Sequence, residues 1–464
     1  MTRVPAGTLM RIAAFGVATR AAAMLAERTG GVAGRRVTLL VGAGNNGGDA
    51  LWAGRFLRRR SVAVSAVLLN PDRAHPEGLA ALCRAGGRVV STVDDSADLV
   101  IDGIVGLSAR GPLRAPAADL VARIAAPVLA VDLPSGVDPD TGAVGGPAIT
   151  ADTTVTFGCL KPVHLLGEGL VRCGAVHVVD IGLGPELGEP DLVALDPADV
   201  AAAWPVPGPR DDKYTQGVTG IVAGSATYPG AAVLTTGAAV RATSGMVRYA
   251  GSAADEVRAR WPEVVATGSV ADAGRVQAWV AGPGLGTGSA GREVLAEVLR
   301  DGLPTCVDAD GITLLATNPG LWDARDPDAP VVLTPHDREF ARIAEPMGIT
   351  LGDDRVAAAR ELAGRTGSVV LLKGSSTVVA DPSGRVLVNP ARSAWLATAG
   401  SGDVLSGLIG SLLAAGLDPW RAAGCAAWVH ERAGDLAAAD APTSASRILD
   451  AIPDAIRAAR AGVV

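Results

Sequence analysis

Short and continuously apolar segments recur along the chain and alternate with longer stretches that are typical of helices. Between Arg35 and about Asp180 we expect strands at Val37–Val41, Val62–Leu69, Leu99–Ile101, Val128–Val131, Thr153–Phe157 and Ala175–Val179. Many of these segments lack the alternation of a strand with one face in solvent, so they indicate parallel strands that helices cover on both faces. The pattern predicts a doubly wound α/β domain.

A region rich in proline, glycine and acidic residues separates this series from a second one. The region runs from Gly182 to Asp212 and is typical of a linker. Beyond it we expect strands at Val218–Ala223, Val276–Ala281, Thr305–Asp308, Val331–Leu333, Val369–Leu372 and Thr377–Ala380, with helices after Asp403. The sequence therefore predicts two α/β domains in tandem.

Composition excludes several classes of protein. The 464 residues carry a net charge of -7, which argues against a nucleic-acid binder that neutralises phosphates over a broad surface. The five cysteines show neither CxxC nor Cys/His spacing, which excludes a disulfide framework and favours a reducing compartment. The longest uncharged run, Tyr214 to Val240, is interrupted by glycine and proline, so it predicts strand, turn and helix rather than a membrane span. We expect a cytoplasmic protein that binds neither nucleic acid nor a membrane.

The first expected strand runs into a glycine-rich turn, GAGNNGGDAL, which begins at Gly42 and precedes a helix. Its glycines match G-x-G-x-x-G, a weak signal by itself, and the next strand ends at Asn70 rather than at the acid that binds a ribose in dinucleotide sites. Asn45, Asn46 and Asp49 instead add amide oxygens and a carboxylate at a helix N-terminus. Such a turn could hold a phosphate and coordinate a hard cation.

Two further loops follow strands of the same domain and are expected at the same edge of its sheet. One carries Asp102 and a glycine-rich stretch from Gly106 to Pro112, and the other carries Asp132 and Ser135. After a later strand, Lys161 could carry a proton. Each residue also has an ordinary structural explanation, a helix cap or turn for the aspartates and a surface salt bridge for the lysine.

The strongest single signal is TAGSGDVLSGLIGSLLAAG, from Thr398 to Gly416. Gly400 and Gly402 allow a tight turn before a helix, whose first N–H groups can stabilise charge on a transferred phosphoryl group. Asp403 stands where it could take a proton from an attacking hydroxyl, and its structural alternative is a plain helix N-cap.

Other parts of a nucleotide site precede this turn. Lys373, Gly374 and Thr377 lie in an expected strand-to-strand turn, the stretch from Gly282 to Gly288 forms a second glycine loop, and His336 follows a strand. A lone histidine is more often structural, so His336 counts only with its neighbours. The sequence contains no P-loop and no protein-kinase motif, which excludes both of those chemistries.

The combination of NNGGD, D-x-x-x-G, LPSGVD and T-x-x-x-x-K-P over residues 8 to 207 resembles the epimerase domain of bifunctional NAD(P)H-hydrate repair enzymes, which has a Rossmann-like, three-layer α/β/α fold. The resemblance implies that the hydrated nucleotide contacts Asn45, Asn46, Gly47, Gly48, Asp49, Gly106, Leu107, Ser108, Ala109, Arg110, Gly111, Pro112 and Asp132. It also implies a potassium ion on Asn46, Asp102 and Ser135, and proton chemistry by Asp132 and Lys161. The sequence departs from the family at Ala50, where glycine is usual, and in a short N-terminal segment that we expect to lack the family's first helix.

Residues 208 to 464 resemble the ADP-dependent NAD(P)H-hydrate dehydratase domain, whose α/β fold is ribokinase-like. The resemblance implies that ADP contacts Lys373, Gly374, Ser375, Ser376, Thr377 and Gly402. It implies that the hydrate contacts Ala231, Gly284, Gly286, His336 and Asp403, with Asp403 as the catalytic base. A magnesium ion is expected for the phosphate transfer, although the sequence offers no isolated ligand motif for it.

Together the two resemblances imply the repair of nicotinamide cofactors that have added water. The second domain would use ADP to dehydrate the S epimer to NADH or NADPH, giving AMP and phosphate, and the first would interconvert the R and S epimers. The alternative is a ribokinase-like small-molecule kinase, of hydroxymethylpyrimidine or sugar type, with a non-catalytic N-terminal binding domain. We also expect a homo-oligomer whose small-molecule partners are NADH hydrate, NADPH hydrate and ADP.

Overall fold

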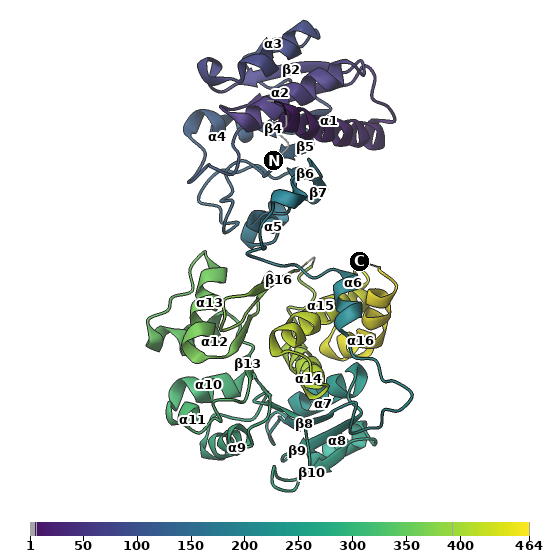
Figure 1. Cartoon of the computed structure of the whole chain (residues 1–464), viewed down its shortest axis with the longest axis vertical. Coiled ribbons are helices and arrows are strands. Elements are labelled where there is room, and N and C mark those ends of the chain that lie inside the picture. Colours follow the sequence, from purple (N-terminus) through teal and green to yellow (C-terminus); the bar gives the residue numbers. More distant parts are fainter. Residues whose placement is uncertain (1–4, 6, 392, 464) are drawn as a thin grey trace. The chain divides into compact units, whose positions relative to one another are not determined.

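The computed structural model describes residues 5, 7–391 and 393–463, which form two compact units. The first unit extends to Pro190 and the second begins at Asp191. Each unit has its own sheet and its own hydrophobic core, and Figure 1 labels many of their helices and strands.

The first unit is built on a sheet whose strands are all parallel and lie in the order β3-β2-β1-β4-β5-β6-β7. The strands are β1 (Arg36–Val41), β2 (Ala63–Leu68), β3 (Arg88–Val90), β4 (Leu99–Gly103), β5 (Val128–Val131), β6 (Thr153–Phe157) and β7 (Ala175–Val179). The α-helices are α1 (Thr8–Thr29), α2 (Asn45–Arg58), α3 (Pro76–Arg84), α4 (Ala115–Val121) and α5 (Gly167–Arg172). The strand order changes direction between β1 and β4, and ligands bind at this place in doubly wound sheets.

Neighbouring residues of the central strands point to opposite faces of the first sheet and enter different cores. Leu39 of β1 packs with residues of α1, α2 and α3, whereas the next residue, Leu40, packs with Ala117 of α4. The first unit is therefore the expected three-layer α/β/α domain. Ala50 is fully buried in α2, and the absence of a side chain on Gly103 leaves room for its methyl group.

The helix that precedes β1 is long and apolar. Among the described residues, α1 is the one helix that could cross a membrane by length and composition alone. Its residues Ala14, Val17 and Ala21 are fully buried, and they pack in the same core as α2 and the sheet. In this structure α1 therefore packs as a core helix of the first unit.

The second unit contains a nine-stranded sheet in the order β10-β9-β8-β11-β12-β13-β14-β15-β16. The strands are β8 (Val218–Val222), β9 (Met246–Ala250), β10 (Val265–Thr267), β11 (Ala278–Ala281), β12 (Thr305–Val307), β13 (Val331–Leu333), β14 (Val369–Leu372), β15 (Ser376–Ala380) and β16 (Val386–Pro390). The first seven strands in this order, which end with β14, are parallel. The last two, β15 and β16, pair in antiparallel fashion.

Helices cover both faces of the second sheet. They are α6 (Pro197–Ala203), α7 (Pro229–Ala242), α8 (Ala254–Arg260), α9 (Ser289–Arg300), α10 (Asp310–Thr317), α11 (Gly320–Asp323), α12 (Asp337–Ala344), α13 (Arg355–Thr366), α14 (Ser401–Ala414), α15 (Pro419–Ala438) and α16 (Ala445–Arg460). The helices α7, α14, α15 and α16 share one large core, and Figure 1 shows α9, α10, α12 and α13 on the other side of the sheet.

The structure contains every strand that the sequence predicts, with bounds that differ by at most two residues. The uncharged run from Tyr214 to Val240 contains β8 and most of α7, as expected. Four strands were not predicted, namely β3, β9, β10 and β16.

The division between the units lies earlier than the expected boundary at 207/208, although it falls within the expected linker. Val193 forms a β-bridge with Leu387 of β16, and α6 packs against α15 and α16. Residues 191–207 therefore pack with the second unit rather than with the first.

Candidate functional site

The loops that follow β1 and β4 approach each other so closely that they require glycine. A Cβ atom on Gly42 would lie 1.7 Å from the carbonyl oxygen of Ile104, and one on Gly47 would lie 2.2 Å from the carbonyl oxygen of Gly42. Gly44 has a φ of 87° and directly precedes α2. The glycines thus bring the N-terminus of α2 against the loop after β4, at the point where the strand order changes direction.

Asp132 and Lys161 meet at this edge of the first sheet, where the sequence leads us to expect the loops that follow its strands. The Lys161 ammonium lies 2.9 Å from Oδ1 of Asp132 and also donates to the carbonyl oxygen of Phe157 at 2.9 Å. The Thr156 hydroxyl donates to the same Oδ1 at 2.8 Å. Both charged side chains are largely buried, with exposed fractions of 14% and 13%. The pair is therefore held in a fixed geometry, unlike a surface salt bridge.

Asp102 and Ser135 are hydrogen-bonded to each other, and Asn46 is linked to Ser135 through the backbone of Val105. Asp102 is fully buried, and it accepts hydrogen bonds from the hydroxyl and the backbone N–H of Ser135 at 2.7 and 2.8 Å. Among the described residues no lysine or arginine forms an ion pair with it. Burial raises its pKa to about 6, against the hydrogen bonds from Ser135, which lower it.

This group offers only oxygen atoms to a cation. The Asn46 side-chain N–H donates to the carbonyl oxygen of Val105, which leaves the amide oxygen of Asn46 for another partner. A fully buried carboxylate, a hydroxyl and an amide oxygen suit a hard monovalent cation, which would also offset the buried charge of Asp102. The residues present therefore fit a potassium ion.

Asp49 faces the same region from α2, directly after the first turn of that helix. It is 8% exposed, and its Oδ1 has no hydrogen-bond partner among the described residues. Burial, and to a lesser extent the negative charge of Asp132, raises its pKa to about 8. An open pocket is lined by Asn45 and Asp49 together with Leu9 and Met10 of α1.

The loop from Gly106 to Pro112 lies partly beside this turn. Gly106 is next to the Asn46 side chain. Leu107, Ser108 and Gly111 are exposed, and Arg110 forms an exposed ion pair with Asp140 at 2.6 Å. The structure thus brings the Gly106 end of the loop to the site, while its middle lies at the surface.

The second unit has a comparable site at the start of α14. Gly400, with a φ of 83°, is the N-cap, and the N–H groups of Gly402 and Asp403 lie in the first turn, where a helix offers them no carbonyl partner. Asp403 is part of this turn. The expected glycine turn at a helix N-terminus is therefore present.

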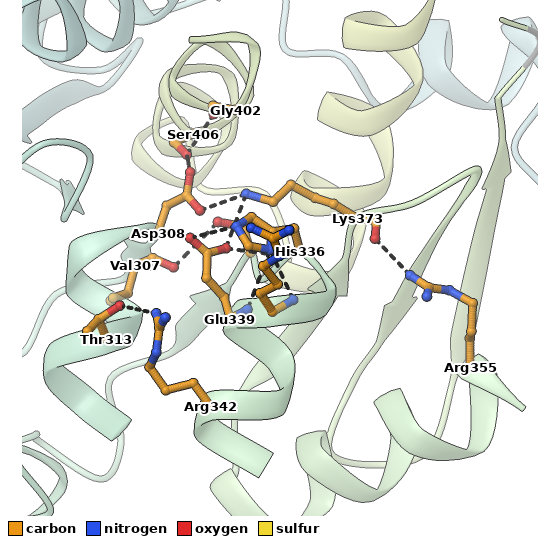
Figure 2. Close-up of polar contacts among 12 residues, drawn as sticks. Val307, Asp308, Thr313, His336, Glu339, Arg342, Arg355, Lys373, Gly402 and Ser406 are labelled. Atoms are coloured by element: carbon orange, nitrogen blue, oxygen red, sulfur yellow. Dashed lines mark hydrogen bonds and ion pairs between the residues drawn. The ribbon is translucent and has the colours of Figure 1, made fainter. Parts of the chain in front are cut away.

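Lys373 forms an ion pair with the buried Asp308 directly beside Gly402. The Lys373 ammonium lies 2.9 Å from Oδ1 of Asp308, and the Ser406 hydroxyl donates to the other carboxylate oxygen at 2.7 Å. A Cβ atom on Gly402 would lie 3.5 Å from that ammonium and 3.6 Å from that second oxygen. Figure 2 shows the ammonium between Asp308 and Glu339, whose carboxylate oxygen is 3.8 Å away.

The pKa values of two groups in this cluster are raised, and for one of them the nearby charges reverse the effect of burial. Burial opposes the charged form of Lys373, but the carboxylates of Asp308 and Glu339 outweigh burial and raise its pKa. Burial raises the pKa of Asp403 to about 7, and repulsion by Asp308 contributes, while Lys373 acts against both. A carboxylate with a pKa near 7 is suited to accept a proton at neutral pH.

The stretch from Lys373 to Thr377 is only partly a turn. Lys373, Gly374 and Ser375 connect β14 to β15, whereas Ser376 and Thr377 are the first residues of β15. The expected turn is thus shorter than predicted, because Thr377 is paired with Asn389 in the antiparallel ladder.

Ala231 and the second glycine loop lie side by side. A Cβ atom on Gly284, whose φ is 61°, would lie 2.9 Å from the Ala231 methyl group. The N–H of Gly286 donates to the Asp310 carboxylate at 2.9 Å. The loop therefore packs on the N-terminal turn of α7.

His336 caps α12. Its Nδ1 accepts from the N–H groups of Arg338 and Glu339 at 3.1 and 3.4 Å, and the Glu339 carboxylate accepts from the His336 N–H at 3.0 Å. The imidazole is 51% exposed and lies in the same cluster as Lys373 (Figure 2). Its structural role is thus present, and the half-exposed ring remains accessible to a ligand.

Sequence reasoning assigned no role to Asp308, Asp310 or Ser406. Asp308 comes directly after a buried parallel strand, which is the signal that could have found it. Ser406 carries no such signal because it lies within α14 and is 98 residues away from Asp308 in the sequence.

Comparison with known proteins covers both units. The family described as NAD(P)H-hydrate dehydratase matches residues 219–454, and the family described as YjeF-related protein N-terminus matches residues 6–163. The chain is 59% identical to the bifunctional NAD(P)H-hydrate repair enzyme Nnr of Mycobacterium tuberculosis, over 99% of this chain and 96% of that protein.

Solved structures resemble the second unit. The ADP/ATP-dependent NAD(P)H-hydrate dehydratase of Bacillus subtilis, co-crystallised with ATP and Mg²⁺, is 27% identical, with a TM-score of 0.50 over 57% of this chain and 97% of that chain. A ribokinase-like superfamily protein of Enterococcus faecalis, 22% identical, has a TM-score of 0.52 over 59% of this chain and 98% of that chain. The second similarity shows the fold alone.

Proposed function

The chain belongs to the family of bifunctional NAD(P)H-hydrate repair enzymes, and from this premise we propose how its residues divide the repair. The enzyme epimerises the R and S forms of NAD(P)H hydrate and dehydrates the S form to NAD(P)H with ADP, giving AMP and phosphate. This function is favoured over the small-molecule kinase alternative. We assign epimerisation to the first unit and dehydration to the second.

In the second unit, Asp403 accepts the proton of the substrate hydroxyl. The hydroxyl oxygen attacks the terminal phosphoryl group of ADP, and AMP departs. The N–H groups of the 400–403 turn and the Lys373 ammonium stabilise the negative charge on the phosphoryl group. The C–O bond then breaks with loss of phosphate, a far better leaving group than hydroxide. Loss of a proton from the adjacent carbon restores the double bond.

The contacts of the two substrates in this unit are likewise proposals. ADP is bound by Lys373, Gly374, Ser375, Ser376, Thr377 and Gly402. The hydrate is bound by Ala231, Gly284, Gly286, His336 and Asp403. The proximity of Ala231 to Gly284, and of His336 to Lys373, supports a continuous binding surface.

In the first unit, Asp132 and Lys161 carry the proton chemistry of epimerisation, and their buried contact supports this role. The hydrate is bound by Asn45, Asn46, Gly47, Gly48, Asp49, Asp132 and the loop from Gly106 to Pro112. A potassium ion held by Asn46, Asp102 and Ser135 would offset the Asp102 charge and orient a nucleotide phosphate.

For magnesium we propose a site that is not built from protein side chains. Among the described residues, no three His, Cys, Asp or Glu side chains gather as they would to enclose a metal ion. Asp308 and Glu339 already face Lys373. We therefore assign magnesium to the phosphates of ADP and to water, since Mg²⁺ in phosphoryl-transfer sites commonly keeps several waters.

We further propose a cytoplasmic homo-oligomer. All five cysteines are free, and Cys173, Cys306 and Cys425 are buried, which suits a reducing compartment. Light scattering of the purified chain and fractionation of cells test these two statements.

The observation that carries the dehydratase assignment is the convergence of Asp403, Lys373 and Asp308 at the start of α14. The test incubates the protein with mixed NADH hydrate epimers and ADP, and then with ATP, while nicotinamide absorbance and nucleotide products are followed. We expect recovery of NADH with stoichiometric AMP and phosphate, and a loss of about 10²- to 10⁴-fold in Asp403→Asn. A stable phosphorylated product would instead support the kinase alternative.

A further inference from the structure

A buried histidine joins the two residues that we assign to epimerisation. His164 ends η2 (Pro162–His164), a short 3-10 helix that begins directly after Lys161, and the histidine is only 3% exposed. Its Nδ1 lies 3.0 Å from the backbone nitrogen of Lys161, and its Nε2 lies 2.8 Å from the backbone carbonyl oxygen of Asp132. One imidazole ring thus spans the main chains of both residues.

The two contacts fix the protonation of the ring. The backbone N–H of Lys161 can only donate, so Nδ1 of His164 is the acceptor. The carbonyl oxygen of Asp132 can only accept, so Nε2 carries the hydrogen and donates. A neutral imidazole with hydrogen on Nε2 satisfies both partners, and burial favours the neutral ring because it lowers the His164 pKa.

The residue at the other end of this bridge has an unfavourable backbone conformation. Asp132 has a φ of 68°, in the left-handed region that residues with a side chain rarely adopt. Such conformations persist only where surrounding contacts hold them, and they occur often at functional sites. The hydrogen bond from His164 is one of these contacts, together with the Asp132 N–H bond to Val155 at 2.8 Å.

Lys161 is held from both sides as well. Its side chain reaches Asp132 and Phe157, while its backbone N–H is bonded to His164. The side-chain ion pair and the imidazole bridge therefore close a ring of contacts between Asp132 and Lys161. A change at His164 would alter the approach of the carboxylate and the ammonium without removing either group.

We propose that His164 is a positioning residue of the epimerase site. This proposal rests on the assignment of epimerisation to Asp132 and Lys161. It acts through the main chains of those two residues and does not itself touch the substrate. Its neighbours Val163 and Leu165 are buried, so the ring is part of the interior wall behind the site.

Three substitutions separate the contributions of the two ring nitrogens. His164→Leu removes both hydrogen bonds. His164→Asn can still accept from the Lys161 N–H, and His164→Gln can still donate to the Asp132 carbonyl oxygen. His177→Leu is the matched control, because His177 lies on the edge strand β7 and is exposed.

The assay uses the full chain and purified R epimer without ADP, so that only epimerisation proceeds, and it follows the epimer ratio by chromatography. We expect His164→Leu to lower kcat about 100-fold, the effect of misplacing catalytic groups by roughly 1 Å, while KM changes less than about threefold. His164→Asn and His164→Gln should recover part of this loss. Dehydration of the S epimer with ADP, measured on the same preparations, should stay at the level of the parent protein.

Each other outcome has a definite meaning. The inference is wrong if His164→Leu keeps the parental kcat, if it raises KM alone, or if the Asn and Gln variants are no better than Leu at equal thermal stability of the first unit. Asp132→Asn is run in parallel to test the underlying assignment. If Asp132→Asn epimerises normally, the proposed epimerase site itself is wrong, whatever His164 does.

Discussion

Dehydration should depend on pH through the ionisation of Asp403. Its pKa is raised to about 7, first by burial and then by the charge of Asp308. A general base must be deprotonated, so the rate rises as pH increases through 7. One-proton titration gives an ionised fraction of roughly a tenth at pH 6 and roughly nine tenths at pH 8, so kcat/KM should rise about tenfold between them.

ADP complicates this measurement, because its terminal phosphate also titrates, near pH 6 as in other phosphate monoesters. A pair of substitutions distinguishes the two titrations. Asp308→Asn removes the negative charge that repels the Asp403 carboxylate, while burial remains, so the pKa of Asp403 should fall part of the way toward its ordinary value and the rise of the profile should move to lower pH. Ser406→Ala removes only a hydrogen bond to Asp308 and keeps its charge, so the profile should stay that of the parent.

The assay is the initial rate of NADH recovery from S hydrate at varied ADP, from pH 5.5 to 9, for the parent and both variants. The absolute rate of Asp308→Asn should also fall, because Lys373 loses its nearest partner, but the shape of the profile decides the question. The reasoning is refuted if the profile of Asp308→Asn coincides with that of the parent, since the titrating group would then be ADP rather than Asp403.

Three further outcomes test the first unit. The folded-state pKa of Asp49, about 8, lies above its ordinary value of 3.8, so the parent should lose stability as pH rises from about 4 to about 8. Asp49→Asn should lack this loss. At about 1.4 kcal/mol per pKa unit, its free energy of unfolding at pH 8, measured by chemical denaturation, should be higher than that of the parent by a few kcal/mol. Gly42→Ala should cost about 1 to 3 kcal/mol or more in the same experiment, because its Cβ would overlap the Ile104 carbonyl oxygen, whereas Gly31→Ala, with nothing within 4 Å, should cost little. Replacing potassium with lithium should slow epimerisation and leave dehydration unchanged, and Asp102→Asn should make epimerisation slow in either salt, as read from the epimer ratio without ADP.

The central strands could be predicted because a strand that is buried on both faces is apolar at nearly every residue. A run such as Leu99–Ile101 is apolar throughout, since each residue enters one of two cores. The strands at the edges of the sheets lack this continuous apolar pattern. The three residues of β3 are exposed or half-buried, β10 is similar, and Arg248 interrupts the apolar pattern of β9. Their place in the sheet depends on a neighbouring strand rather than on their own composition.

The candidate sites show the same limit in another form. Glycine turns and acids at strand ends are local signals, so the sequence could place Asp132 and Asp403 at the ends of the correct elements. The roles of Asp308 and His164 depend on partners far away in the chain. Lys373 is 65 residues from Asp308, and Asp132 is 32 residues from His164. The strand end marks Asp308 as a candidate, but only the fold shows that its partner is Lys373, and the sequence carries no local signal for His164.

The pairing of Val193 with β16 has a practical consequence for anyone who wishes to produce the two halves as separate polypeptides. A gene cut at 207/208 would remove a bridging residue and a whole helix from the dehydratase half and would leave them as an unsupported tail on the epimerase half. A cut after Pro190 keeps each packed layer with the sheet that it covers.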